Sequence, residues 1–176
     1  MVFLDESGFM LQPVVRRTWA PRGQTPILRQ WDRRDRLSAI SARTVAPHRR
    51  RFGLYWALHR HNIRTAEVLR FLRALVRHLP HGFTLVWDRG QPHRAVAVRD
   101  WLAARAPRIV VAWLPPYAPD CNPVEAVWSH TKHGDLANFA PADLDHLAGA
   151  VLGSFTRTRE TRTLLAACLQ AAELRI

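Results

Sequence analysis

Three acidic residues occupy positions from which a carboxylate could hold a metal ion. Asp5 and Asp88 each follow a short apolar run, and Glu125 stands near the start of a helix-like segment. Ionised carboxylates at the ends of buried strands are costly unless they are paired or metal-bound. Mg²⁺ prefers hard oxygen ligands, usually a few carboxylates together with water and substrate phosphate. Two such ions about 4 Å apart can activate an attacking oxygen and stabilise a leaving one, as phosphoryl transfer requires. Asp5 and Asp88 also have a simpler interpretation as turn formers or caps.

Glu125 has an alternative interpretation as part of a helix cap. It lies in the segment LPPYAPDCNPVEAVW (114–128), whose four prolines predict a rigid, extended lead-in to a helix. Asn122 suits the N-cap, Pro123 the first helical position and Glu125 the third, which is the pattern of a capping box. If Glu125 is a metal ligand instead, the helix N-terminus favours its ionised form, and the prolines fix where the helix begins.

Other catalytic and metal-binding patterns are weak. The groups HRH (59–61) and SHTKH (129–133) resemble metal sites only loosely, because nine histidines make chance neighbours common. Cys121 and Cys168 have neither the spacing of metal ligands nor that of a disulfide framework, so reduced thiols are expected. No apolar run approaches the ~20 residues of a membrane helix, and no secretory signal is apparent. These features favour a cytoplasmic protein.

The charge balance favours a nucleic-acid partner. The chain has a formal net charge of +12, and 25 of its 26 basic residues are arginine. The planar guanidinium suits phosphate, and positive charge attracts the nucleic-acid backbone. Codon bias is an alternative explanation for the choice of arginine over lysine. The arginines concentrate in residues 1–60, with local runs at 29–36 and 48–51.

The order of predicted elements indicates an α/β fold in which helices cover a mixed central sheet. Strands are expected at 2–7, 36–45, 51–59, 82–89 and 108–115, and helices at 65–79, 92–106, from 123 onwards and within 141–173. Residues 12–36 are expected to be turns and irregular strand. In such sheets the functional crevice lies beyond the carboxyl ends of strands, where Asp5 and Asp88 fall. Glu125 follows the last strand and can reach the edge of the same crevice.

Four motifs resemble the catalytic domain of DDE superfamily transposases, specifically bacterial insertion-sequence transposases related to the mariner elements. They are FLDESGF (3–9), RRTWAPRGQTP (16–26), LVWDRGQPHR (85–94) and LPPYAPDCNPVEAVWSHTK (114–132). The resemblance implies a ribonuclease-H-like fold and a catalytic, metal-binding triad of Asp5, Asp88 and Glu125. It also implies Mg²⁺ or Mn²⁺, as two ions, and cleavage and strand transfer at transposon DNA ends by a homo-oligomer.

The sequence departs from this family in two respects. Arg89 stands where the family usually has a small amide, which puts a bulky cation beside the metal site. The family also carries helix-turn-helix units before its first catalytic strand, whereas residues 1–176 are expected to be a single catalytic domain without them. An upstream partner chain could supply end recognition. Two alternatives stay open: a catalytically silent DNA-binding remnant of a truncated or split transposase, and a structure-selective ribonuclease-H-like nuclease.

Several residues near the triad and in the basic runs are candidate DNA contacts. His93 lies in the turn after Asp88, and Lys132 lies seven residues beyond Glu125, near the same helical face. A structural histidine at a helix start and a solvated lysine are the alternatives for these two. The arginine candidates are Arg89 and Arg94 near the site and Arg33, Arg34, Arg49 and Arg50 in the runs. Phosphate contacts alone would make binding independent of DNA sequence.

Overall fold

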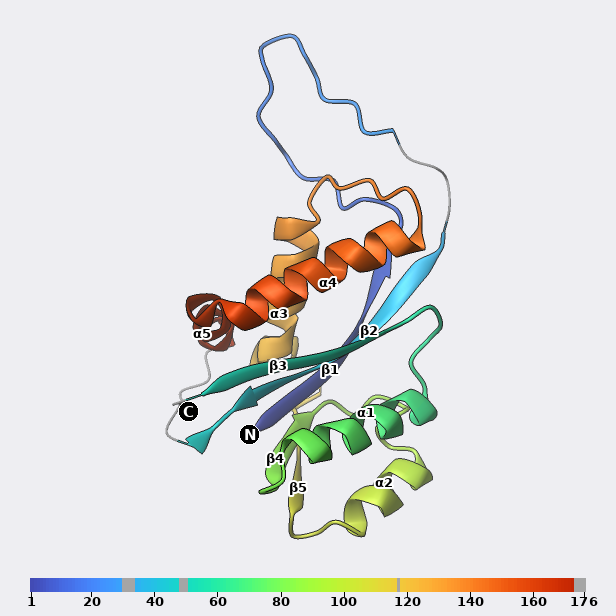
Figure 1. The fold of residues 1–176 in the computed structure, drawn as a ribbon, viewed down its shortest axis with the longest axis vertical. Coiled ribbons are helices and arrows are strands. Elements are labelled where there is room, and N and C mark those ends of the chain that lie inside the picture. Colours follow the sequence, from blue (N-terminus) through green and yellow to red (C-terminus); the bar gives the residue numbers. More distant parts are fainter. Residues whose placement is uncertain (30–33, 48–50, 117, 173–176) are drawn as a thin grey trace.

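A five-stranded mixed sheet forms the centre of the fold (Figure 1). The computed structural model describes residues 1–29, 34–47, 51–116 and 118–172. The strands lie in the order β3-β2-β1-β4-β5. Their bounds are β1 (Val2–Met10), β2 (Arg36–Val45), β3 (Phe52–His59), β4 (Phe83–Trp87) and β5 (Ile109–Trp113). The α/β architecture with a mixed sheet, predicted from the sequence, is confirmed.

Helices cover both faces of the sheet. They are α1 (Thr65–His78), α2 (Val96–Ala103), α3 (Pro123–His130), α4 (Leu144–Glu160) and α5 (Arg162–Ala171). Side chains alternate between faces along a strand, so β1 contributes side chains to two separate hydrophobic cores. Val2 and Leu4 pack with α1 and α2, whereas Phe3 and Phe9 pack with α3, α4 and α5. The sheet is therefore the middle layer of three.

The pairing of β1 decides where the acidic residues lie. β1 runs antiparallel to β2 but parallel to β4, and the parallel pairing covers only Val2 with Leu85 and Phe3 with Val86. β4 ends at Trp87 while β1 continues to Met10, so the two strands part. Extending the register by two residues brings Asp5 level with Asp88. A cleft opens at this parting, at the carboxyl end of β4.

Three elements differ from the sequence-based expectations. β1 is longer than the predicted 2–7, so Asp5 lies within the strand and not at its end. The predicted helix at 92–106 is shortened to Val96–Ala103, because turns with bonds to the Gly90 carbonyl precede it. The predicted helical region within 141–173 is divided at Thr161, whose extended backbone separates α4 from α5.

The chain between β1 and β2 makes a long excursion away from the sheet (Figure 1). Its described part is largely irregular, as predicted, and its base is tied to the loop before α4 through a bridge between Val14 and Ala137. The backbone N–H of Arg16 also donates to Asn138 Oδ1 over 2.8 Å. Within the described ranges, no helix combines the length and apolarity needed to cross a membrane.

Candidate active site

Asp5, Asp88 and Glu125 line one cavity of about 450 Å³ at the parting of β1 and β4. The cavity is completed by the loop after β4, with Arg89 and Gly90, and by the segment that leads from β5 to α3. The first carboxylate comes from a strand, the second from the loop that follows a strand, and the third from the first turn of a helix. Three elements distant in sequence thus contribute one acidic side chain each.

Asp5 is held in place by a tryptophan of α3. Trp128 Nε1 donates a hydrogen bond of 2.8 Å to Asp5 Oδ2, and Trp128 itself is buried. Burial raises the pKa of Asp5 to about 7; the hydrogen bond from Trp128 opposes this rise, and the charges of Glu125 and Glu6 add to it. A carboxylate in such surroundings gains from a cation, because positive charge offsets both the desolvation and the repulsion.

Asp88 is held by the loop that follows it. The backbone N–H of Gly90 donates to Asp88 Oδ1 over 3.0 Å, and His93 Nδ1 lies 2.6 Å from the same oxygen. Within the described ranges no hydrogen bond engages the second oxygen, Oδ2. The side chain is more than half exposed, at 57%. One oxygen therefore fixes the orientation of the carboxylate, and the other is available to a ligand.

His93 joins Asp88 to a fourth acidic residue, Glu6. His93 Nε2 lies 2.8 Å from Glu6 Oε1, and the ring stacks on Trp87 with centroids 4.2 Å apart. Burial lowers the pKa of His93, but the hydrogen bond and charge of Glu6 and the charge of Asp88 outweigh burial, so this pKa is raised above its usual value. The ring is 1% exposed and both of its nitrogens face carboxyl oxygens. In this position His93 supports Asp88, and a direct contact with DNA stays a prediction.

Glu6 is the participant that the sequence analysis did not identify. It follows Asp5 directly, so the alternation of the strand directs it to the opposite face of the sheet, toward His93. Its side chain is only 23% exposed. The signal was present in the sequence as two consecutive acids, but it could be used only with knowledge that β1 continues past both.

Glu125 is placed by the start of α3, as predicted, but it does not complete a capping box. Asn122 Oδ1 accepts a hydrogen bond of 3.2 Å from the N–H of Val124, which makes Asn122 the N-cap. The N–H of Asn122 donates instead to the Pro119 carbonyl over 2.8 Å. The donor that a capping glutamate needs is therefore already satisfied. Glu125 is exposed, and its carboxylate makes no hydrogen bond within the described residues.

The three carboxylates surround the cavity without closing on one point. Among the described residues, no group of three or more His, Cys, Asp or Glu side chains is close enough together to hold a metal ion. Negative charges that face one cavity repel each other, and the charge of Glu125 adds to the effect of burial in raising the pKa of Asp5. The three residues line one cavity, and their convergence on a shared metal ion stays a prediction.

Lys132 approaches the site from the far end of α3. A wide π-helical turn, Thr131–Asp135, follows the helix and carries Lys132 over β1. Its Nζ donates to Ser7 Oγ over 2.7 Å and lies 5.3 Å from the centroid of the Phe9 ring. Burial lowers the pKa of Lys132, while the charges of Glu125 and Asp5 oppose that shift. Lys132 is therefore partly buried and within electrostatic range of two of the triad residues.

The predicted arginine contacts occupy different positions. Arg89 lines the triad cavity and is exposed, whereas Arg94 and Arg34 are exposed at other places on the surface. Arg33, Arg49 and Arg50 lie outside the described residues. Of the three candidates that the structure describes, only Arg89 lines the triad cavity.

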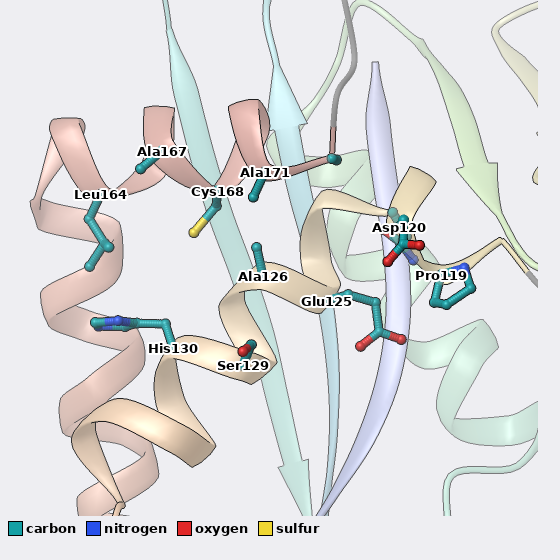
Figure 2. A pocket seen from close by; sticks show the side chains of 12 residues that line it. Pro119, Asp120, Glu125, Ala126, Ser129, His130, Leu164, Ala167, Cys168 and Ala171 are labelled. Atoms are coloured by element: carbon teal, nitrogen blue, oxygen red, sulfur yellow. The ribbon is translucent and has the colours of Figure 1, made fainter.

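A second cavity, of about 520 Å³, lies along α3 from Glu125 to His130 and faces α5 (Figure 2). Ala167, Cys168 and Ala171 of α5 form its apolar wall, opposite Ala126 of α3. Glu125 lines both cavities, so it stands at their boundary.

Comparison with known proteins identifies the family. The sequence pattern of the family described as DDE superfamily endonuclease matches residues 1–147 of the chain. The chain belongs to this family. The match includes Asp5, Asp88 and Glu125 together with Glu6 and His93. A comparison with curated proteins gave no match.

Solved structures of the Mos1 mariner transposase share the fold of this DDE endonuclease domain. The Mos1 paired-end complex with Mn superposes with a TM-score of 0.70 at 19% identity, over 98% of this chain and 53% of that one. The paired-end complex with left transposon end gives 0.65 at 19% identity, over 97% and 55% of the two chains. The isolated Mos1 catalytic domain gives 0.61 at 15% identity, over 98% and 74%. The fold is therefore ribonuclease-H-like, and the chain spans about half the length of the longer Mos1 chains.

Proposed function

We propose that this DDE endonuclease domain is the catalytic part of a transposase that cleaves DNA and transfers the freed strand. The observation that carries the proposal is the meeting of Asp5, Asp88 and Glu125 at one cavity from three separate elements. Mos1 transposase, which has the same fold, is described in paired-end complexes with DNA and with Mn or Mg. The transfer of those properties to this chain is part of the proposal.

The donor set fits a hard divalent cation such as Mg²⁺ or Mn²⁺. Asp88 Oδ2 and the Glu125 carboxylate have no hydrogen-bond partner within the described ranges, and Asp5 carries a pKa raised by burial and by neighbouring negative charge. Carboxylates in this condition favour oxygen-ligated ions over zinc, which prefers nitrogen and sulfur. We assign the ion-binding role to these three residues and expect two ions. When bound, such ions supply Lewis acidity and a more acidic water.

The remaining side chains of the site orient and support these ligands. Trp128 fixes one oxygen of Asp5, and Gly90 with His93 fixes one oxygen of Asp88. Arg89 on the cavity rim carries the positive charge expected to meet a phosphodiester, and Lys132 adds a cation near Glu125. Water would attack the phosphodiester first, and the freed 3′-hydroxyl would then attack target DNA.

DNA is the proposed substrate, in the form of transposon ends and a target duplex. The excess of arginine supplies affinity for DNA that is independent of its sequence. In addition to Arg89, the exposed Arg94 and Arg34 are candidate phosphate contacts. Recognition of a terminal repeat needs an element that enters a groove, which we assign to helix-turn-helix units on a partner chain. A homo-oligomer would hold two DNA ends together.

A nicking assay tests the proposal. Supercoiled plasmid carrying the element's terminal repeats would be incubated with Mn²⁺ or Mg²⁺, with and without the upstream helix-turn-helix partner. Glu125→Gln removes one charged ligand on an exposed side chain and is expected to lower nicking by about 10³-fold or more, a scale typical of catalytic electrostatics. Glu160→Gln makes the same chemical change at an exposed position of α4 and serves as the matched control.

Two outcomes separate the proposed function from a silent DNA-binding remnant. Metal-dependent nicking that Glu125→Gln abolishes and Glu160→Gln preserves supports the catalytic assignment. Binding of random duplex that weakens steeply with salt, without any nicking in the presence of the partner, identifies the remnant. A tenfold preference for the terminal repeat by this chain alone, about 1.4 kcal/mol, would show that the chain contains its own recognition element.

A further inference from the structure

The open edge of the sheet carries a groove remote from the triad. β3 is the outermost strand of its side of the sheet, and a groove of about 430 Å³ follows its middle. The groove is bounded by Phe71, Ala74 and His78 of α1 on one face and by Arg159 of α4 on the other. In Figure 1 the strand runs between these two helices. The groove therefore lies where a sixth strand would lie.

The alternation of hydrogen bonds along β3 shows which of its backbone groups bond to β2 and which face the groove. The N–H of Ala46 donates to the carbonyl of Arg51, and Ser41 Oγ donates to the carbonyl of Tyr55. In an antiparallel ladder, residues alternate between facing the partner strand and facing away. With the observed register, Gly53, Tyr55 and Ala57 are directed toward β2. Trp56 and Leu58 therefore present their N–H and carbonyl groups to the open edge, whereas Leu54 has the same phase but is buried.

This edge lacks the usual protection against pairing. Natural edge strands are commonly blunted by lysine, proline, bulges or short length. β3 is eight residues long, and its sequence FGLYWALH contains no Asp, Glu, Lys, Arg or Pro. Among the described residues, no loop or helix backbone donates to or accepts from Leu54, Trp56 or Leu58. Trp56 and Leu58 thus offer unused backbone groups on a strand without charged side chains.

The surroundings of the groove are basic. Arg70 and Arg159 line it, and Arg159 also lies over the Trp56 ring at 4.8 Å. Arg159 approaches Glu160 only at 3.8 Å, and Arg70 makes no ion pair within the described part of the chain. A second copy of the chain would bring its own Arg70 and Arg159 to the same groove, so like charges oppose self-pairing. An acidic partner meets no such repulsion.

We propose that the β3 edge binds an extended, acidic peptide segment of a partner protein as a sixth strand. Strand addition takes its affinity from backbone hydrogen bonds and its specificity from pockets for alternate side chains. A strand residue occupies roughly 160 Å³ at the usual spacings of 3.3, 4.8 and 10 Å, so the groove holds about three residues. Apolar side chains would contact Tyr55, Phe71 and Ala74, and flanking carboxylates would meet Arg70 and Arg159.

Hydrogen exchange on the intact chain tests the pairing. The probe is a blocked heptapeptide, Asp-Asp-Val-Leu-Val-Asp-Asp, added to isotope-labelled protein and followed by amide exchange. The amides of Trp56 and Leu58 are expected to become slower in exchange on saturation. Those of Tyr55 and Ala57 already face β2 and should change little. Slower exchange at every second amide of β3 distinguishes strand addition from binding elsewhere on the surface.

Charge variants test the partner's chemistry. Arg70→Glu and Arg159→Glu are each expected to weaken binding of the heptapeptide at least tenfold. Arg73→Glu makes the same change of charge on an exposed residue of α1 that does not line the groove, and should leave affinity within threefold. A heptapeptide with lysine in place of aspartate should not bind. These measurements do not involve the triad, so their result is independent of the proposed catalysis.

Each of the following results would overturn the proposal. These are no protection at millimolar peptide, equal protection of both sets of amides, equal losses in Arg73→Glu and Arg70→Glu, or protection that rises with protein concentration in the absence of peptide. The last result would identify a second copy of the chain as the occupant. The same alternating protection produced by single-stranded oligothymidine would identify nucleic acid instead.

Discussion

The two strand-side carboxylates and the helix-side carboxylate of the site are positioned by different means. Asp5 is fixed by the indole of Trp128, and Asp88 by Gly90 and His93. Glu125 has no hydrogen-bonding side-chain or backbone partner within the described residues and depends on where α3 begins. The strand-side acids are therefore fixed in orientation, whereas Glu125 is fixed only at its backbone and can rotate about its side-chain bonds.

This difference indicates how the site can admit a charged ligand. Two rigid carboxylates define the floor of the cavity in advance, at low cost in side-chain entropy when a cation arrives. The third adapts from the rim, where the boundary between the two cavities gives it room. The carboxylates of Asp5 and Asp88 are thus oriented in advance, whereas the carboxylate of Glu125 can adjust its position.

Changes of side-chain length should have the most different effects on nicking rate at the oriented carboxylates and at Glu125. Asp5→Glu and Asp88→Glu would each displace a carboxylate from its fixed partners, and a misplacement of about 1 Å can cost about 10²-fold in rate. Glu125→Asp, at an unrestrained side chain, is expected to cost about tenfold. Single-turnover nicking rates of the three variants would measure this. Equal losses in all three would show that Glu125 is as rigidly required as the others.

The support of Asp88 by His93 should be visible in metal affinity. His93→Ala removes the contact with Asp88 Oδ1 and leaves Glu6 without its partner. Loss of such a supporting residue typically costs 10–100-fold in metal affinity. Manganese titration followed by electron paramagnetic resonance would measure it. The matched control is His93→Asn, which retains a donor near the position of Nδ1 and should recover manganese affinity. Unchanged manganese affinity in His93→Ala would show that His93 does not support Asp88.

The metal-free chain should show the burial of Asp5 as a pH-dependent stability. The pKa of Asp5 is raised to about 7 in the folded state, above its usual value of 3.8, so ionisation of Asp5 opposes folding. The contribution is favourable at low pH and is lost as pH rises through 7. Asp5→Asn, which stays neutral, should therefore stabilise the metal-free chain at pH 8 more than at pH 5. Urea unfolding in a chelator at both values measures this, and a pH-independent difference would contradict it.

The smallest effect is expected at the start of α3. Asn122→Ala removes the acceptor for the N–H of Val124 and should cost about 1 kcal/mol of folding stability, as is typical of N-cap loss. Because Glu125 depends on that helix start, nicking should fall by more than the stability change alone explains. Asp143→Ala removes the N-cap of α4, away from the cavity, and should cost similar stability without this extra loss.

The sequence singled out Asp88 and Glu125 because each stands at the end of a strong local pattern, and the family resemblance joined them to Asp5. Asp88 ends an apolar strand, and Glu125 follows a proline-rich lead-in whose helix start the structure confirms. The contact of Glu6 with His93 could not be predicted, since it joins residues 87 positions apart and requires the full length of β1. The local sequence pattern indicates which side chains could do chemistry, but it does not indicate which distant residues they contact.

Arg43 illustrates the same limit for charge. Arg43 lies between the two arginine runs, and its side chain is fully buried on β2 and donates to the Leu165 carbonyl of α5. Burial lowers the pKa of Arg43 to about 10. The sequence gives the alternation of β2 but not the helix that covers it, so a buried arginine cannot be distinguished from an exposed one.

The opposite directions of Asp5 and Glu6 have a consequence at the level of the gene. Insertion or deletion of one codon upstream within β1 would leave the composition of the strand almost unchanged. It would nevertheless exchange the two acids between the faces of the sheet, because strand side chains repeat every two residues. An insertion would place Asp5 at the position that faces His93, and a deletion would place Glu6 at the position that faces Trp128. The length of this short segment is therefore under tighter constraint than its apolar residues, many of which can be exchanged for others of similar size.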